Sequence, residues 1–594
     1  MRRLAGIEQI KGDPLLLSKH CIFAVLLALF SSVTVNASNY YVASTATGGG
    51  TGSQSDPWQL QEAFNSPAAL ANPSDTVWIW IDGGTYTNTY DAQTSFSCFT
   101  NGSVNAPIIF RNFHNERVII DGQLPITLRF GLDKCSYTWI WGLEITNSST
   151  ADRDHPAYAR AGDIECTAEN IRLINLIVHD MGSGLSLWKT AKNTEAYGCI
   201  IYNIGNNSNN GGNWEGHGHG MYLQNDTVGI KNIHNNIVFN TFGYGVKVWQ
   251  TTTTAALGNF SIERNIVFNG GAASENLGGV GNNTRTHNFF VVSNSAGNPI
   301  TNTVIKHNYT FSGNNTPRPP VNAFGLNYGV RNMILDSNYI TCQTRLGFNN
   351  TPIFDASVKD NNIIAGIPPE YGNYLWGFQA ADYPQNTYLA AEPDSGLEYF
   401  ILRNKYQSTR SHIVIYNWAG ADSVQIDLTK SGLMSGDSYE LINVMDFYSD
   451  MDSGTVSASG AISIAMAGHT FAPVTGSNKP SVSQFPKFGV FVIRKIDSPV
   501  ASVVYERSVP GDLNIYPNPS NTGFNVKFNS DHSGQHQIFI SDARGKLVSK
   551  PRDAFFTHGN HEITIDMDDL PAGVYFIMFK DMYGCRTGRV LLKN

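Results

Sequence analysis

The segment Ile233–Asn240, IHNNIVFN, returns almost unchanged as Ile262–Asn269, IERNIVFN. Related segments follow at Ile305–Phe311 (IKHNYTF), Leu335–Ile340 (LDSNYI) and Val358–Ile364 (VKDNNII). Apolar and polar residues alternate in each segment, which is typical of a half-buried strand, and an asparagine stands at the same offset. Asparagine suits a turn that tolerates left-handed backbone geometry, and its amide can stack on the amide of the next repeat. We therefore expect one strand and one turn per repeat.

The repeats extend over residues 105–365 at uneven intervals, without helical periodicity between the strands. A fold with crossover helices is therefore disfavoured, and a solenoid of roughly 20 to 30 residues per coil remains. Its beginning fits as well, with a strand at Asn39–Ala43, a capping helix at Asp56–Ala63 and a first coil at Asp75–Tyr86. Together these segments resemble the right-handed parallel β-helix proteins of the pectate-lyase-like superfamily. The resemblance implies an all-β fold, and we expect the β-helix to occupy residues 38–375.

Composition excludes some classes of protein. The 594 residues carry a formal net charge of −8, and 41% are hydrophobic, 11% aromatic and only 15% charged. This balance indicates a folded chain rather than a disordered one. Nucleic acid is not an expected partner, since its binding requires a basic footprint.

The N-terminus has the features of a signal peptide. The apolar stretch Ile22–Phe30 follows Lys19, is too short to span a membrane, and is followed by Val35-Asn36-Ala37 with small residues at the cleavage positions. We predict residues 1–37 to be a signal peptide, and the mature chain to have no transmembrane segment. The six cysteines that remain lack zinc-binding spacing and are expected to be mostly buried small residues: Cys98, Cys135, Cys166, Cys199, Cys342 and Cys585.

Beyond the repeats the pattern changes twice. Longer alternating strands with glycine-rich turns, such as His412–Tyr416 and Phe488–Arg494, predict a β-sandwich over residues 376–497, to which we assign no chemistry. A polar linker at 498–512 follows, and then a third unit at 513–594, which we expect to be a small β-sandwich.

The third unit contains four spaced motifs: Leu513–Ser520, Asp542–Val548, Leu570–Ile577 and Arg589–Asn594. In this order they resemble the C-terminal sorting domain of the type IX secretion system. The resemblance implies that the secretion machinery is a partner, and that the protein is exported to the outer-membrane surface or the extracellular space.

Three coils align without gaps around a strand, at Gly184–Trp188, Gly220–Gln224 and Gly245–Trp249. The alternation places Ser186, Tyr222 and Lys247 in one outward column, which Glu165 extends by one coil, and Trp188, Gln224 and Trp249 in the next column. Neighbouring coils lie about 4.8 Å apart, so each column brings side chains within hydrogen-bonding reach. Aromatic side chains beside such a column suit the apolar faces of sugar rings, and the columns therefore predict a glycan-binding groove.

The turns before these strands add further candidates, in Asn213–Gly220 and Phe242–Gly245. Together with the first column, these turns supply a cluster that we expect to contain the acid, base and charge-stabilising groups. Its members are His217, His219, Tyr222, Tyr244, Lys247 and Glu165. The substrate-binding candidates are Trp188, Trp249, Tyr244 and Gln224. Asp152 and Asp154 add two carboxylates suited to a cation such as calcium, although their spacing matches no standard loop.

Each candidate also has a structural alternative. Gly-His-Gly can be a tight turn whose histidine caps backbone groups, and an outward Lys247 can be a solvated charge. Solvated loop charge is the simpler interpretation of Asp152, Asp154 and Glu165.

Gly218-His219-Gly220 and Val246-Lys247 also resemble two motifs of the polygalacturonase family of inverting glycoside hydrolases. The resemblance implies that His219 assists acid/base chemistry and that Lys247 binds a substrate carboxylate. However, Val246 stands where that family has arginine, and Ser183–Trp188 lacks the paired aspartates of the hydrolytic step.

Three hypotheses follow from the sequence. The first is a secreted polysaccharide lyase that acts on an acidic glycan. The second is a glycoside hydrolase that uses Glu165 with Asp163, Asp152 or Asp154. The third is a glycan-binding or adhesive surface protein without turnover. The combination of ionisable and aromatic residues in the columns favours an enzyme.

Overall fold

The computed structural model describes residues 38–592 except for 72, 88–94, 123–128, 154–161, 207–217, 227, 250–256, 274–286, 294–297, 312–322, 327–328, 348–352, 367–372, 479–480, 482, 497–512, 521–522, 531–533, 543–547, 549–551, 558, 568–569 and 582–583. The predicted signal peptide lies outside the described residues. The chain divides into two compact units, one made of residues up to 435 with 440–494, and the other of 436–439 with the residues from 495 onwards.

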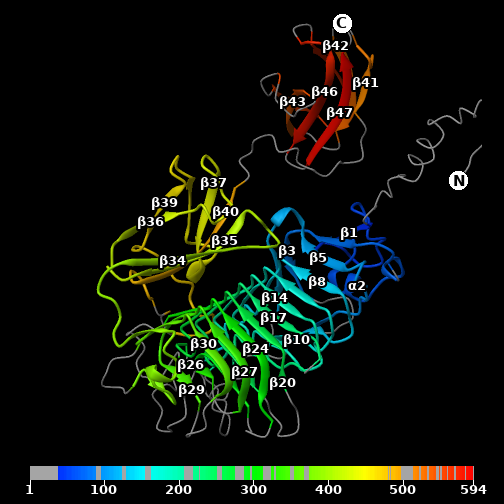
Figure 1. Ribbon diagram of the computed structural model, residues 1–594. Helices are drawn as coiled ribbons and strands as arrows, with labels where there is room; N and C mark the ends of the chain where they lie inside the picture. Colours follow the sequence, from blue (N-terminus) through cyan, green and yellow to red (C-terminus); the bar gives the residue numbers. More distant parts are fainter. Residues whose placement is uncertain are drawn as a thin grey trace, which may run out of the picture. The chain divides into compact units, whose positions relative to one another are not determined.

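The first unit contains a right-handed parallel β-helix, as predicted (Figure 1). Its coils contribute strands to three parallel sheets, here named I, II and III. Sheet I contains β1 (Ser38–Val42), β2 (Val77–Ile81), β5 (Ile108–Asn112), β8 (Thr138–Trp141), β11 (Arg172–Ile174), β14 (Glu195–Tyr197), β17 (Lys231–His234), β21 (Phe260–Glu263), β24 (Ile300–Lys306), β27 (Val330–Asp336) and β30 (Phe354–Lys359), with β20 (Leu257–Gly258) beside β24.

Sheet II contains β3 (Gly84–Tyr86), β6 (Val118–Asp121), β9 (Glu144–Thr146), β12 (Ile177–His179), β15 (Ile200–Tyr202), β18 (Ile237–Phe239), β22 (Ile266–Phe268), β25 (Tyr309–Phe311), β28 (Tyr339–Thr341), β31 (Asn362–Ile364) and β33 (Thr387–Leu389). Sheet III contains β4 (Phe96–Ser97), β7 (Arg129–Leu132), β10 (Asp163–Cys166), β13 (Leu185–Leu187), β16 (Met221–Leu223), β19 (Val246–Trp249), β23 (His287–Val292), β26 (Ala323–Leu326), β29 (Thr344–Leu346) and β32 (Leu375–Trp376). The last strand of sheet II lies beyond residue 375, at which the sequence analysis placed the end of the β-helix.

Inward-facing aliphatic side chains from all three sheets form one continuous core, and many of them are completely buried. The short helix α2 (Leu60–Phe64) covers the first coils, and its Ala63 and Phe64 are fully buried in the same core. A helix at this place protects the open end of a solenoid from pairing with other strands.

The asparagines of the repeat form a buried ladder along the β-helix. In each step a side-chain amide donates to the Oδ1 of the next asparagine at 2.8–3.0 Å, through Asn236, Asn265, Asn308, Asn338, Asn361 and Asn386. The predicted stacking is confirmed, but the left-handed geometry belongs to the preceding residue in each repeat, which has φ between 52° and 59°: Asn235, Arg264, His307, Ser337 and Asp360. The turn can thus accept several residue types at its left-handed position, whereas the ladder position requires the amide.

Two antiparallel sheets follow the β-helix in the chain. The larger contains β34 (Leu397–Arg403), β35 (Arg410–Asn417), β40 (Phe488–Lys495), β37 (Ser438–Asn443) and β38 (Met451–Thr455), and the smaller pairs β36 (Ser423–Asp427) with β39 (Ala461–Ala465). Outward aromatic residues of sheet II, such as Phe268 and Phe311, pack with Tyr416 and Phe488 of the larger antiparallel sheet in one buried cluster. This face of the β-helix is therefore an internal interface.

The second unit has two antiparallel sheets, one with β41 (Asn514–Tyr516), β42 (Gly523–Ser530) and β45 (Gly559–Asp566), the other with β44 (Arg552–Phe556), β43 (Gly534–Asp542), β46 (Gly573–Asp581) and β47 (Gly584–Leu592). Phe524, Val526, Ile577 and Phe579 belong to its own apolar core. Antiparallel sheets around a shared core agree with the small C-terminal sandwich that the sequence predicts.

Five of the predicted buried cysteines are indeed buried and free: Cys98, Cys135, Cys166, Cys199 and Cys342. The described part of the chain contains no helix that is both long and apolar enough to cross a membrane. The division of the chain at residues 375, 497 and 512 stays a prediction.

Candidate functional site

Sheet III aligns the first predicted column. In the register of β10, β13, β16 and β19, Glu165 lies beside Ser186, Ser186 beside Tyr222, and Tyr222 beside Lys247. Their inward neighbours, for example Leu185, Met221 and Val246, are completely buried. Hydrophobic alternation predicted which side chains face outward, because successive side chains of a strand point to opposite faces, and the gapless alignment of the coils predicted which of them are neighbours.

The Gly-His-Gly turn has a structural basis in both glycines. Gly218 has φ of +79°, a left-handed conformation, and a Cβ there would lie 2.5 Å from the Cα of Gly205. A Cβ on Gly220 would lie 2.3 Å from Val238 Cγ1. The two glycines thus satisfy packing between coils, while His219 between them is left beside the outward column.

Lys247 lies among aromatic rings and one imidazole. Its Nζ is 3.4 Å from His219 Nε2, and it lies 4.7 Å from the ring centroid of Tyr244, 4.8 Å from that of Trp249 and 6.0 Å from that of Tyr222. No carboxylate forms an ion pair with Lys247 among the described residues. This differs from the solvated surface lysine that the sequence left open.

The environment of Lys247 changes its acidity. Burial lowers the pKa of its ammonium group from 10.5 to about 8, because the charged form loses solvation. The aromatic faces compensate only part of that loss. Burial also raises the pKa of Tyr222, although the amide of Gln224, which donates to its hydroxyl at 3.2 Å, opposes the shift. Near neutral pH the site therefore combines a protonated phenol with a lysine close to its titration point.

The remaining binding candidates surround the same place. Trp188 and Trp249 are half-buried rather than exposed, and Gln224 is buried. The Gln224 amide also donates to the carbonyl of Trp249 at 3.1 Å, while the ring of Trp188 packs edge-on against Tyr222 at 5.4 Å. The second column therefore forms one wall of the site instead of a row of free rings.

Two further aromatic groups and one lysine belong to the site, although the sequence analysis missed them. Phe290 lies beside Lys247 in the register of β23, and His287 packs against Phe290 and Tyr244 with ring centroids at 4.7 and 5.6 Å. The long insertion before β23 hid this alignment.

Lys231 is fully buried in sheet I, and its Nζ donates to the carbonyls of Trp188 and Gln224 at 2.8 and 2.7 Å. Lys231 thereby connects the ends of β13 and β16. No sequence motif distinguishes it from other lysines in strands.

The structure does not bring every predicted residue together. Glu165 is half-buried and lies three strands from Lys247, about 14 Å away at the usual strand spacing. Asp152 is exposed, and His217 and Asp154 lie outside the described residues. Across the described ranges, no three histidine, cysteine, aspartate or glutamate side chains form a group that could hold a metal ion. The calcium hypothesis stays a prediction, because Asp154 is not among the described residues.

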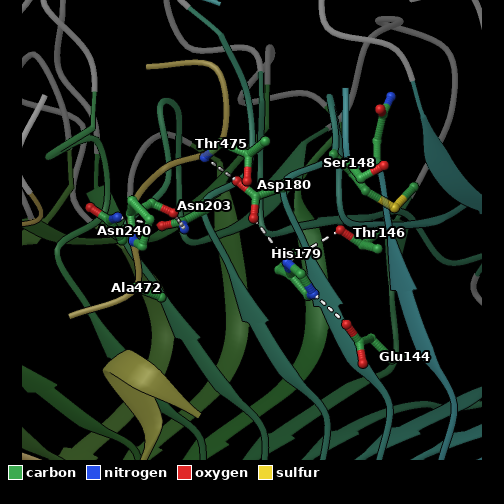
Figure 2. A network of polar contacts seen from close by, with 12 residues as sticks. Glu144, Thr146, Ser148, His179, Asp180, Asn203, Asn240, Ala472 and Thr475 are labelled. Carbon is green, nitrogen blue, oxygen red and sulfur yellow. Dashed lines mark hydrogen bonds and ion pairs between the residues drawn. The ribbon is translucent and has the colours of Figure 1, made fainter. Parts of the chain in front are cut away.

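A second polar cluster lies on sheet II (Figure 2). His179 contacts Asp180 through Nδ1 and Glu144 through Nε2, both at 2.9 Å, and Asp180 accepts from the backbone N–H of Thr475 at 2.9 Å. Arg153, the residue between the two aspartates noted in the sequence, is completely buried and forms an ion pair with Asp180 at 3.0 Å. These charges alternate in sign and join the β-helix to the chain segment around residue 475.

Burial would lower the pKa of His179, but the hydrogen bonds to Asp180 and Glu144 outweigh it and raise that pKa to about 9. Burial would raise the pKa of Glu144, but hydrogen bonds from Arg117 and His179 lower it to about 2. The cluster is therefore an ionised network at neutral pH. Its role is structural, because its charged groups are already paired with one another.

Comparison with known families identifies the second unit. Residues 514–593 match the model described as the secretion system C-terminal sorting domain. This part of the chain is a type IX sorting domain, and the protein is exported to the cell surface or the extracellular space. The chain is thus an exported protein built on a parallel β-helix. No curated protein sequence matches it.

Solved structures with a similar architecture include pectate lyase Pel9A, at 16% identity and a TM-score of 0.35, over 55% of this chain and 80% of the other. PfbA, a surface adhesin of Streptococcus pneumoniae, is 12% identical with a TM-score of 0.26, over 51% and 86%. The tailspike protein of E. coli bacteriophage HK620 is 10% identical with a TM-score of 0.28, over 71% and 75%. Similarities this low carry no information on activity.

Proposed function

We propose that the protein is a polysaccharide lyase that cleaves an acidic glycan at sheet III, with Lys247 as the base. The observation that supports this proposal is the position of Lys247, half-buried among aromatic rings, without a carboxylate partner among the described residues and with its pKa lowered to about 8. A general base works best when its pKa lies near the working pH, and an ordinary lysine does not meet that condition.

The elimination assigns a role to each neighbouring group. The neutral amine of Lys247 takes the proton at C5 of a uronate, the bond from C4 to the leaving sugar oxygen breaks, and a C4–C5 double bond forms. The hydroxyl of Tyr222, protonated because its pKa is raised, donates a proton to the leaving oxygen. His219, at 3.4 Å from Lys247, orients the amine. The rings of Trp188 and Trp249 contact the sugar faces.

The proposal is tested with the purified exported protein and a panel of acidic and neutral polysaccharides. We expect unsaturated products, detected by their ultraviolet absorbance, together with new reducing ends. The ratio kcat/KM should rise with pH through about 8, because the base must lose its proton first. New reducing ends without ultraviolet absorbance would contradict elimination and favour the hydrolase alternative.

Lys247→Arg separates a base from a charge-stabilising group. Arginine retains the positive charge but cannot act as a base near neutral pH, so we expect at least a 100-fold loss of kcat. Lys192→Arg is the matched control, because Lys192 forms surface ion pairs with Glu169 and Asp226. Full activity of Lys247→Arg would refute the role of Lys247 as base.

The binding-protein alternative has a separate test. The protein would then bind polysaccharide without turnover across the whole panel, and Trp188→Ala combined with Trp249→Ala would abolish the binding. Turnover of any glycan excludes this alternative.

A further inference from the structure

A cavity lies between the β-helix and the larger antiparallel sheet, on another face from sheet III. It has a volume of about 270 Å³. One wall consists of residues around β5, β6, β8 and β9, and the other of residues from β35, β37, β40 and the turn at Phe447 and Tyr448. A ligand of monosaccharide size suits this volume, which lies just below the ~300 Å³ at which pockets for drug-sized ligands begin.

Two of the three arginines that line this cavity have carboxylate partners. Arg117 pairs with Glu144 at 2.6 Å, and Arg494 pairs with Glu440 at 2.5 Å. A third carboxylate, Glu116, is exposed and accepts a hydrogen bond from the N–H of Gly83. The carboxylates at the cavity are therefore already engaged.

Arg410 is the exception. Only 7% of its surface is exposed, and its Nε and Nη2 are buried without a hydrogen-bond partner among the described residues. Its neighbour in the strand register is Arg494, which adds repulsion rather than compensation. Burial and this repulsion lower the pKa of Arg410 to about 10, so its guanidinium still carries its charge at neutral pH. A buried charge without a counter-charge is costly, and an anion in the cavity would compensate it.

Asn175 adds a donor of the same kind. It lines the same cavity, its Oδ1 accepts from the amide of Asn404 at 2.7 Å, and its Nδ2 is buried without a partner among the described residues. The unsatisfied polar atoms of the described cavity lining are thus donors only: Arg410 Nε, Arg410 Nη2 and Asn175 Nδ2. A ligand that only accepts hydrogen bonds at this point, such as a carboxylate, complements them.

We propose that this cavity binds one small sugar acid, a uronic acid monosaccharide, with its carboxylate on Arg410 and Asn175. Asn112, Gln407, Trp141 and Tyr448 also line the cavity and supply amide groups and aromatic surface to the sugar. The unpartnered nitrogens are buried, so this binding mode requires the side chain of Arg410 to turn until its nitrogens reach the carboxylate. The site is separate from Lys247 and holds a ligand without reacting with it.

The test is isothermal titration of the purified exported protein with sodium galacturonate. We expect saturable binding that galactose, the neutral analogue, does not reproduce. Arg410→Met should weaken it at least tenfold, because the counter-charge is lost. Lys247→Ala should leave this binding unchanged, which separates the cavity from the proposed catalytic site.

Asn175→Asp is a second variant that keeps the shape of the site. Its carboxylate would supply the missing counter-charge to Arg410, so we expect galacturonate binding to disappear while the unfolding temperature rises. Aspartate also tolerates the left-handed conformation of this residue, whose φ is 51°.

Four outcomes would overturn the proposal. They are no binding to the wild-type protein, equal binding of galactose, binding that survives both Arg410→Met and Asn175→Asp, and binding lost in Lys247→Ala alone. Equal affinity for sodium sulfate would overturn the sugar component and leave a general anion site.

Discussion

Replacement of His179 by phenylalanine tests the ionised network on sheet II through the pH dependence of stability. The pKa of His179 is about 9 in the folded chain and 6.5 in the unfolded chain. Because the folded value is raised, the resulting stability is complete below pH 6.5 and is lost as the pH rises through 9. Linkage between these two values stabilises the folded state by about 2.5 kcal/mol at pH 7 and about 0.1 kcal/mol at pH 10.

Phenylalanine is chosen because it preserves the packing. The ring of His179 stacks on Tyr202 at 4.9 Å, and this aromatic row continues through Phe239 and Phe268. In the variant, Glu144 keeps its ion pair with Arg117. Asp180 keeps its ion pair with Arg153 and its hydrogen bond from the N–H of Thr475, so neither carboxylate is left unpaired.

The assay is urea unfolding of the exported protein at pH 7, 8, 9 and 10, followed by tryptophan fluorescence. The difference in unfolding free energy between wild type and His179→Phe should shrink by about 2.5 kcal/mol from pH 7 to pH 10. His234→Gln is the control, since burial lowers the pKa of His234 and the ring stays neutral over this range. Its difference from wild type should not change with pH. A constant or growing difference for His179→Phe would refute an ionised His179 at neutral pH.

Other predictions concern the ladder, the interface and the groove. Asn265→Ala removes four buried side-chain hydrogen bonds and should lower the free energy of unfolding by about 4 kcal/mol, measured by denaturant titration. The control Asn101→Ala, at an exposed amide, should lower it by less than about 0.5 kcal/mol. Arg153→Met should cost about 3 kcal/mol or more in the same measurement, because Asp180 loses one of its two cationic partners and the buried carbonyl of Asn203 loses its donor. Trp249→Ala should weaken polysaccharide binding about tenfold in affinity electrophoresis, while unchanged binding would exclude this ring from the groove.

Local pattern was sufficient to predict the repetitive part of the fold. Alternation in Gly220–Gln224 and Gly245–Trp249 predicted which side chains face inward, because a strand has a period of two residues. The gapless alignment of the same segments predicted that Tyr222 lies beside Lys247. The amide ladder followed from an asparagine at a constant offset. The sorting domain followed from four short motifs in order, since such a signal is encoded in contiguous sequence.

Only the tertiary structure decided how each polar group is paired and how deeply it is buried. His179 and Glu144 lie 35 residues apart, and Asp180 and Thr475 lie 295 apart, so no local pattern reveals the network. In an isolated coil, the outward side chains of sheets II and III would both be exposed. In the folded chain the antiparallel sheet covers the outward side chains of sheet II but not the column of Lys247 on sheet III. Burial and pairing set pKa values and leave Arg410 without a counter-charge, and both depend on contacts between segments that are distant in the sequence.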